Sequence, residues 1–382
     1  MAPIIPIIPI IHCLLPYKET YTPQNAGAVA LTVEGGFNKS AFSKNAVVFG
    51  RHLSTSSHLS TPILGNAMYQ GLAPRQPWLR GKNIGLARAY LHHIKRHGAP
   101  DLLEVHGRLQ VAEDIGRKRP DLNMGLYLHN DPREMKAGKT VSMRRALLDR
   151  MTVIYCVSDY LRSCFLDGID VSEEDAEKVK IIPIAADRLL KHPPSKDKLI
   201  SIIGRMVPEK GMLGAAKALA SVLPRYPDWK VIFAGAQRFE DAPPSAYEAS
   251  IAEALNPIRE QAKMTGFIPR LEIMDIQNRS AIILAPSEWQ EPAGRVVIEA
   301  LACGAALITS RRGGIPEYAE GRAIILDEGK PADLAEALER LITDENWRLS
   351  WQKKAWADYP FDTAHMGAKL DKARYHALGI TG

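Results

Sequence analysis

Short apolar runs alternate along the chain with longer segments in which apolar residues recur at helical spacing. Apolar runs bounded by polar or glycine-containing turns are typical of buried parallel strands, and the segments between them are typical of helices that cover a sheet. This alternation predicts an α/β fold with parallel sheets. The strand-like runs are 7–15, 102–107, 126–132, 151–158, 199–203, 230–235, 281–286 and 305–310.

The alternation is interrupted at Leu190–Lys198, where proline and charged residues cluster. Such a composition is typical of a linker between domains. A chain of 382 residues is also long enough for two hydrophobic cores. We therefore expect two domains, 1–190 and 199–360.

The chain is predicted to be helical from Pro331 onward, and its last segment, 361–382, is expected to be a helix that returns toward the first domain. Three tryptophans lie in this region at four- and five-residue spacing, which is more typical of packing than of chemistry. We expect them to cover the seam between the domains. They are Trp347, Trp351 and Trp356.

The stretch Glu291–Gly304 is a Pro/Gly turn that opens into an apolar helix. Pro292 and Gly294 keep the helix from starting earlier, so its first free backbone amides fall near Arg295 and Val296. Free amides at the positive end of a helix dipole form a seat for an anion such as a diphosphate.

Two carboxylates flank this anion seat. Glu299 lies further along the helix, where a carboxylate accepts hydrogen bonds from neighbouring hydroxyls of a polyol. Glu291 lies in the turn and is placed to hold hydroxyls at the opposite end of the same ligand. The arrangement suits a nucleotide sugar, and the alternative is an ordinary helix start with acidic residues near its positive end.

Arg205 and Lys210 lie five residues apart on the loop after the predicted strand 199–203, between Gly204 and Gly211. An arginine fork and a lysine point charge on one loop are suited to clamping a diphosphate. Flanking glycines permit close approach of the backbone to a ligand. The alternative interpretation is a pair of surface charges.

The N-terminal half contains a second candidate anion seat. Gly27, with Ala26 and Ala28 beside it, lies where a polar loop runs into a helix of small residues, after the predicted strand 7–15. The Gly-x-Gly-x-x-Gly dinucleotide fingerprint is not found in the chain. A plain small-residue helix start is the alternative.

Two strand-like runs end in histidine, one at His106 and one at His129. The edge where buried parallel strands meet their loops is the place where open α/β sheets bind ligands. His129 is the better candidate because the turn Asn130-Asp131-Pro132 follows it directly. A structural role is the alternative for a histidine at a strand end. Ser158 is expected to cap the helix that follows it.

The segment 75–97 holds six lysines or arginines and no acidic residue. Leu86, Ala89, Tyr90 and Ile94 fall at helical spacing, which predicts a basic amphipathic helix that is entered at Trp78. Such a face suits anionic lipid headgroups or an anionic acceptor, with a solvated surface helix as the alternative. It carries no recognition motif for nucleic acid, so we expect no nucleic-acid partner.

The overall composition fits a globular enzyme. The formal net charge of +6 favours anionic ligands or surfaces without identifying either. The four cysteines lie in apolar runs without the spacing of metal ligands, which indicates buried, reduced thiols in a cytoplasmic protein. The apolar start 1–15 contains three prolines and no basic region, so we expect neither a signal peptide nor a membrane anchor.

Taken together, these motifs resemble those of the retaining glycosyltransferases of family four, which have the GT-B fold. The motifs that carry the resemblance are Gly204-Arg205, Lys210-Gly211, Pro286-Ser287, Glu291-x7-Glu299-Ala300, Gly304 and Gly313-Gly314-x-x-Glu317. The match covers nearly all of the C-terminal domain and, through Gly27, His129 and Ser158, part of the N-terminal domain. The region 233–249 and the His-Asn pair after a strand look most like members that build lipopolysaccharide core and surface polysaccharide.

The resemblance implies two Rossmann-like domains facing a cleft, with the C-terminal helix packed at the domain seam. Arg205 and Lys210 would bind the donor diphosphate, Glu299 its ribose and Glu291 the transferred sugar. Gly204 belongs to the same loop. The remaining implied roles are backbone amides from Gly294, Arg295 and Val296, a cap on the diphosphate from Gly27, and His129 at the reaction centre. The family implies retention of anomeric configuration without a required metal, and the sequence shows no cluster of metal ligands.

Three departures from the family pattern concern the sugar and the acceptor. Ala293 replaces the aromatic residue common after the Glu-Pro turn, the usual two-glycine loop keeps only Gly27, and Ile184-Ala185-Ala186 replaces the usual Asn-Gly. None of them touches the cations or the glutamates.

The expected function is transfer of a hexose or N-acetylhexosamine from a nucleotide-diphosphate sugar, with UDP-sugar first, to a glycan or lipid-linked acceptor. The expected setting is lipopolysaccharide or other surface polysaccharide synthesis in the cytoplasm, with peripheral contact to an anionic inner membrane face through residues 75–97. No cofactor is expected beyond the donor. The alternatives are a nucleotide-sugar epimerase of the same fold and an inactive nucleotide-sugar-binding scaffold.

Overall fold

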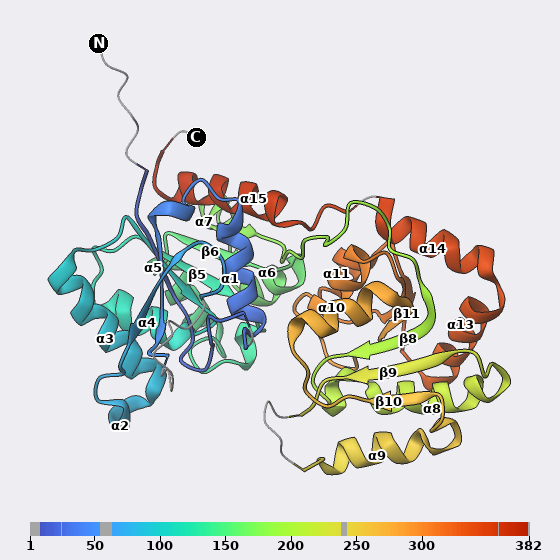
Figure 1. Cartoon of the computed structure of the whole chain (residues 1–382). Coiled ribbons are helices and arrows are strands. Elements are labelled where there is room, and N and C mark those ends of the chain that lie inside the picture. The colour runs from blue at the N-terminus through green and yellow to red at the C-terminus, as the bar shows by residue number, and fades with distance from the viewer. Residues whose placement is uncertain (1–7, 24, 54–62, 238–242, 358, 381–382) are drawn as a thin grey trace. The chain divides into compact units, whose positions relative to one another are not determined.

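The computed structural model describes residues 8–23, 25–53, 63–237, 243–357 and 359–380. The isoleucine-proline repeat of residues 1–7, part of the predicted strand 7–15 and part of the region 233–249 lie outside these ranges. The chain forms two compact units, Met1–Ala185 with Thr363–Gly382, and Ala186–Asp362 (Figure 1).

The described part of the first unit holds a seven-stranded parallel sheet in the order β3-β2-β1-β4-β5-β6-β7. The strands are β1 (Ile11–Leu14), β2 (Ala46–Arg51), β3 (Met68–Leu72), β4 (Leu102–His106), β5 (Met124–Leu128), β6 (Val153–Cys156) and β7 (Val179–Ile181). The helices are α1 (Ala28–Asn38), α2 (Pro77–Arg80), α3 (Lys82–His97), α4 (Leu109–Lys118), α5 (Val141–Arg150), α6 (Asp159–Leu166), α7 (Glu173–Lys178) and α15 (Thr363–Ala377). Short 3-10 turns cover Ser43–Asn45 (η1) and Pro132–Glu134 (η2).

The described part of the second unit holds a six-stranded parallel sheet in the order β10-β9-β8-β11-β12-β13. The strands are β8 (Asp197–Ile203), β9 (Lys230–Ala234), β10 (Ala262–Met264), β11 (Ser280–Ala285), β12 (Ala306–Ser310) and β13 (Ile324–Leu326). The helices are α8 (Met212–Val222), α9 (Ala246–Ala254), α10 (Arg270–Arg279), α11 (Arg295–Ala302), α12 (Ile315–Ala319), α13 (Pro331–Thr343) and α14 (Glu345–Ala357). Three 3-10 turns are η3 (Pro208–Lys210), η4 (Leu223–Arg225) and η5 (Asn256–Ile258).

Strand order determines which loops of each sheet come together. In the first sheet the chain runs outward from β1 to β3 and then resumes on the other side of β1 with β4, so the direction reverses between β1 and β4. In the second sheet the same reversal falls between β8 and β11. The carboxyl ends of parallel strands at such a reversal are where open α/β sheets bind ligands. Each unit therefore has one favoured position for a site.

The second unit begins earlier in the chain than the sequence predicts. Ala186 exchanges hydrogen bonds with the end of this unit, since its amide donates to Phe361 O at 2.9 Å and its carbonyl accepts from Tyr359 Oη at 2.7 Å. The predicted linker is also anchored to this unit, because Lys196 Nζ donates to the carbonyls of Asn278 and Cys303, both at 2.8 Å. The segment is thus joined to the second unit at Lys196, whereas most of its other residues are exposed.

The last helix, α15, belongs to the first unit, where it packs on α1 (Figure 1). Arg374 on this helix is fully buried and forms two hydrogen bonds of 2.8 Å with the Glu104 carboxylate on β4. Asp371 accepts from Ser40 Oγ at 2.6 Å, next to the end of α1. The helix is thus an integral layer of the first unit.

The tryptophans predicted to cover the domain seam have their described contacts inside the second unit. Trp347 and Trp351 pack against its hydrophobic core. The Arg188 guanidinium lies 4.2 Å from the ring centroid of Trp356. The same ring faces Gly304. Packing is therefore their role, as their spacing indicates.

The basic segment 75–97 forms two helices instead of the single helix predicted. Gly81, with φ +84°, separates α2 from α3. The buried face of α3 includes Leu86, Ala89 and Tyr90, as the spacing predicts. Most of the cations are exposed on the remaining face.

Candidate functional site

The second unit has a pocket of about 90 Å³ at the carboxyl ends of β8 and β11, the reversal point of its sheet. Three segments line it: the loop after β8, the loop after β11 and the start of α11. The polar or turn residues that line it are Lys210, Ser287, Glu291, Gly294, Arg295 and Val296. Strand order thus brings most of the predicted donor-site residues together.

Lys210 and Glu291 form an ion pair in the wall of this pocket. Ser287 Oγ donates to the same carboxylate oxygen at 2.9 Å. The Glu291 side chain is 9% exposed, whereas that of Lys210 is 32% exposed. The lysine and the serine therefore hold the glutamate in one orientation. The sequence assigned the two charges to different parts of a ligand and did not predict their direct contact.

Arg205 lies in the loop after β8, next to Gly204, and is exposed. Within the part of the chain that the structure describes, its guanidinium forms no ion pair and no hydrogen bond. Gly204, which precedes it, ends the strand and donates its amide to Ala234 O at 3.0 Å. The loop thus presents a cation at the carboxyl end of β8, the strand whose loop also carries Lys210.

Gly294 begins α11 in the left-handed conformation, with φ +86° and no side chain to cap the helix. The first hydrogen bond of the helix runs from Val297 N to Gly294 O at 2.9 Å. The start of the helix faces the pocket, since Gly294, Arg295 and Val296 all line it. This is the geometry that the sequence predicts for an anion seat.

Glu299 does not line the pocket of Lys210 and Glu291. It lines a smaller cavity of about 30 Å³ beside it. Gln277 Nε2 donates to Glu299 Oε2 at 3.2 Å, and the Arg295 guanidinium lies 4.0 Å from the other carboxylate oxygen. One helical turn separates Glu299 from Arg295, which carries the glutamate beyond the pocket.

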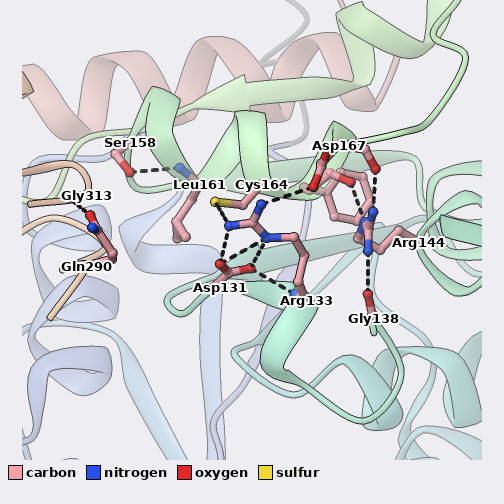
Figure 2. Close-up of polar contacts among 11 residues, drawn as sticks. Asp131, Arg133, Gly138, Arg144, Ser158, Leu161, Cys164, Asp167, Gln290 and Gly313 are labelled. Carbon is pink, nitrogen blue, oxygen red and sulfur yellow. Dashed lines mark hydrogen bonds and ion pairs between the residues drawn. The ribbon is translucent and has the colours of Figure 1, made fainter. Parts of the chain in front are cut away.

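The second glycine-rich turn supports the turn that carries Glu291. Gly314 N donates to Glu291 O at 2.8 Å, and Gly313 N donates to Gln290 Oε1 at 2.5 Å (Figure 2). A Cβ at Gly313 would lie 2.1 Å from Glu291 O, and φ there is +54°. Only glycine fits this close approach. The motif was visible in the sequence, but its partner was not.

In the first unit, Gly27 begins α1, and the start of this helix faces a carboxylate of the same chain. Glu19 Oε2 accepts from Ala30 N at 3.3 Å, and a Cβ at Gly27 would lie 2.6 Å from that oxygen. Burial raises the pKa of Glu19, although the hydrogen bond from Ala30 and the charge of Arg108 act in the opposite direction. The predicted anion seat therefore holds Glu19 in this structure.

His129 contacts His106, which ends the neighbouring strand. The distance from His106 Nδ1 to His129 Nε2 is 3.0 Å, and Tyr127 stacks on both rings. Burial lowers the pKa of His106 to about 3, with a further contribution from Arg374, so this ring is neutral near pH 7.

The buried Nε2 of His106 has no hydrogen-bond partner among the described residues. A buried lone pair without a partner costs less than a buried N–H without one, so the proton belongs on Nδ1 and is donated to His129 Nε2. His106 thus fixes the orientation and the tautomer of His129. The sequence signal for this role was a histidine at the same end of two successive strands.

Ion pairs and hydrogen bonds of two arginines hold the loop that follows His129 (Figure 2). Arg133 pairs with Asp131 at 2.7 Å and with Asp167 at 3.1 Å. The buried Arg144 donates to Gly138 O at 2.9 Å and to two carbonyls at the end of α6. Ser158 caps α6 by accepting from Leu161 N at 3.2 Å, as the sequence predicts. These contacts hold the loop in place.

Two general findings concern the described residues alone. They contain no group of three or more His, Cys, Asp or Glu side chains placed to hold a metal ion. No helix among them combines the length and the apolar character needed to cross a membrane.

Most of the second unit matches a known family model. The family model "Glycosyl transferases group 1" matches residues 187–357. YtcC of Bacillus subtilis (strain 168), provisionally named as a glycosyltransferase, is 26% identical over 277 residues, which are 67% of either protein.

Two solved structures share the fold over nearly the whole chain. Anabaena Alr3699/HepE in complex with UDP has a TM-score of 0.73 at 17% identity, over 96% of this chain and all of that one. WaaG, a glycosyltransferase involved in lipopolysaccharide biosynthesis, has a TM-score of 0.66 at 16% identity, over 97% of this chain and all of that one. The predicted pair of parallel-sheet, Rossmann-like units of GT-B glycosyltransferases is confirmed.

Proposed function

We propose that the protein transfers a hexose or N-acetylhexosamine from a UDP-sugar with retention of configuration, because residues 187–357 match the family model of glycosyl transferases group 1. The acceptor in this proposal is a glycan or a lipid-linked sugar of lipopolysaccharide or another surface polysaccharide. The observation that carries the proposal is the pocket at the reversal of the second sheet, where Lys210 and Glu291 meet beside the start of α11.

The pocket chemistry matches a departing nucleoside diphosphate. Transfer breaks the bond between the sugar and the diphosphate, so negative charge develops on the leaving oxygen. Arg205, Lys210 and the first amides of α11 are suited to stabilise that charge without a metal ion, because they bring two positive side chains and the positive end of a helix to one edge of the sheet. When the donor binds, Lys210 exchanges part of its contact with Glu291 for the diphosphate, and Glu291 turns its free lone pairs to the sugar hydroxyls.

Retention requires attack on the same face from which the diphosphate leaves. In this proposal the leaving phosphate oxygen takes the acceptor proton on that face, and His129 of the first unit donates a hydrogen bond to the sugar. Proton NMR of the freshly formed product reports the anomeric configuration. A product of inverted configuration would rule out this mechanism.

Release of nucleoside diphosphate tests the donor. UDP-, GDP- and ADP-sugars are compared in the presence of a chelator, with Lys210→Met and Glu291→Gln as site variants and the exposed Lys217→Met on α8 as the matched control. We expect release from a UDP-sugar, and a loss of about ten- to a thousandfold in the site variants but not in the control. The HepE structure contains UDP, which supports testing UDP-sugars first.

The same assay separates the alternatives. Conversion of the donor sugar without any acceptor would indicate an epimerase. Tight binding of UDP without release, across acceptors that include lipopolysaccharide core fragments and polyprenyl-linked sugars, would indicate an inactive scaffold. WaaG is a glycosyltransferase involved in lipopolysaccharide biosynthesis, which supports testing lipopolysaccharide acceptors first.

Peripheral membrane contact is part of the proposal and is supported by the surface of α2. Trp78 is 81% exposed and Leu79 62% exposed, and the basic residues Arg75, Arg80 and Lys82 lie near them in the chain. An exposed aromatic and aliphatic pair among cations suits an anionic interface. We expect binding to phosphatidylglycerol vesicles at low salt, reduced by Trp78→Ser and by added salt. Equal sedimentation with phosphatidylcholine vesicles would contradict it.

A further inference from the structure

The first unit contains a pocket of about 330 Å³ at the carboxyl edge of its sheet. Its walls are the starts of α3 and α4 and the loop that follows β5. This volume lies in the range of small-molecule sites. The polar residues that line it are Asn83, Arg108, Gln110, Glu134 and Lys136.

Arg108 has donors that no protein acceptor satisfies. In the described ranges its guanidinium forms no ion pair, and its buried Nε has no hydrogen-bond partner. Its one hydrogen bond there is long, from Nη1 to Gly107 O at 3.4 Å. Glu19 is close enough for Arg108 to act on its pKa, but its carboxylate accepts from Ala30 N and forms no ion pair with Arg108 among the described residues. A partly buried guanidinium without an acceptor costs free energy, which an anionic ligand would recover.

Lys136 approaches the same pocket from the loop after β5. It is exposed and forms no ion pair with any described residue. Glu134 on this loop is the one carboxylate in the lining, so two cations and one carboxylate leave a net positive charge. The first turn of α4 also lines the pocket, and its start has no side-chain cap, which adds partial positive charge.

The residue before Arg108 packs on His129. A Cβ at Gly107 would lie 3.5 Å from His129 Cδ2, and Arg108 is the next residue. His106 fixes the ring of His129 from the preceding position on β4. The unpaired guanidinium therefore lies one residue from the backbone that packs on His129.

We propose that this pocket is the acceptor subsite and that it selects acceptors with a phosphate group close to the reacting hydroxyl. Arg108 binds the phosphate as a planar fork and Lys136 as a point charge. The inference rests on the proposed glycosyltransferase function and adds the chemical class of the acceptor. Both a phosphorylated sugar and a phospholipid headgroup present this group.

Calorimetric titration of the full chain with glycerol 1-phosphate tests the subsite, with glycerol as the neutral control ligand. The titration is run with wild type and with Arg205→Met, so that phosphate bound in the second unit is recognised. We expect binding to weaken about tenfold or more in Arg108→Met and several-fold in Lys136→Met, and to persist in Arg205→Met. Glu134→Gln is expected to strengthen it.

Lys139→Met is the matched control, because Lys139 is an exposed cation on the same loop that does not line the pocket. Arg108 makes one weak hydrogen bond, so its variant is expected to fold, and the melting temperature checks this. If Arg108→Met does not fold, the titration of Lys136→Met still tests the subsite, because Lys136 is exposed.

Unchanged affinity in both Arg108→Met and Lys136→Met, or equal binding of glycerol, would overturn the proposal. Phosphatidylglycerol vesicles form the second arm. Binding of vesicles but not of glycerol 1-phosphate, when lost in Arg108→Met, would assign the phosphate to a lipid headgroup. Release of UDP from the donor is measured separately. Its absence would refute the proposed function without changing the binding result for this pocket.

Discussion

Lys210 and Glu291 are 81 residues apart in the chain and form an ion pair in the wall of the second unit's pocket. Each follows a strand at the reversal of the sheet, Lys210 after β8 and Glu291 after β11. The proposal assigns Lys210 to the diphosphate and Glu291 to the sugar, and without a ligand the two side chains contact each other. Its strength is therefore measurable without any substrate.

Removal of one partner of this pair is expected to cost more than removal of both. Lys210→Met leaves the nearly buried Glu291 carboxylate with only Ser287 as its described partner and should lower the free energy of unfolding by about 1–2 kcal/mol. The loss is smaller than for a fully buried pair, because a third of Lys210 is exposed to solvent. Urea unfolding of Lys210→Met, Glu291→Gln and the double variant gives the coupling energy. Additive effects would show that the contact contributes nothing.

Gly313→Ala is expected to disturb the turn of Glu291. The new Cβ would clash with Glu291 O, so the turn must move, and UDP binding should weaken at least tenfold. Gly321→Ala is the matched control, since Gly321 has a similar positive φ of +73° but a Cβ added there would meet no atom within 4 Å. Both variants carry the backbone cost of about 1 kcal/mol for a left-handed residue. Equal UDP affinity in the two would show that the clash is relieved elsewhere.

His106 is expected to control the tautomer of His129. In ¹⁵N NMR of histidine-labelled protein, His129 should carry its proton on Nδ1 at neutral pH, because its Nε2 accepts from His106. His106→Leu should remove this preference and lower kcat more than KM, whereas His106→Gln, which retains an N–H donor, should restore part of both. A wild-type His129 protonated on Nε2 would contradict the assignment.

Acid is expected to destabilise the first unit through two buried histidines. Burial lowers the pKa of His106 from 6.5 to about 3 and that of His12 from 6.5 to about 4. Below pH 6.5 the unfolded chain therefore binds protons that the folded chain does not, so stability falls as the pH falls toward 4, by on the order of 1 kcal/mol per pH unit for each ring.

Thermal melting between pH 7 and pH 4.5 measures this slope. His106→Gln should flatten it, and the exposed His192→Gln should not. An identical slope in wild type and His106→Gln would refute the contribution of His106.

The buried pair of Arg374 and Glu104 is expected to hold α15 on the first unit. Arg374→Met leaves a carboxylate that is fully buried on β4 and should cost about 3–5 kcal/mol. Addition of Glu104→Gln should recover part of this loss, because the remaining group is neutral. Chemical denaturation measures both, with the exposed Lys372→Met on the same helix as the control. A loss below about 1 kcal/mol in Arg374→Met would show that the helix is held by its apolar contacts alone.

The candidate donor-site residues could be located from the sequence because they lie next to recognisable elements. Arg205 and Lys210 follow an apolar strand, and Gly294 precedes an apolar helix, so local patterns place all three at the carboxyl edge of a sheet. The cap at Ser158 was predicted for the same reason, since capping depends on neighbouring residues. Their roles in catalysis stay predictions.

Other features depended on partners that are distant in the chain. Glu299 was placed with the donor residues, but one turn of α11 carries it to a neighbouring cavity. The anion seat at Gly27 is filled by Glu19. The break at Gly81 was missed because the segment has helical spacing on both sides of it.

The sequence by itself determined the elements of this protein, since the spacing of apolar residues and the position of glycine and proline act over a few residues. Only the tertiary structure decided which of these elements meet. The order of strands placed β8 beside β11 and β4 beside β5, and so brought Lys210 to Glu291 and His106 to His129. Strand order depends on how whole sheets and helices bury their apolar faces, and no short stretch of sequence records that.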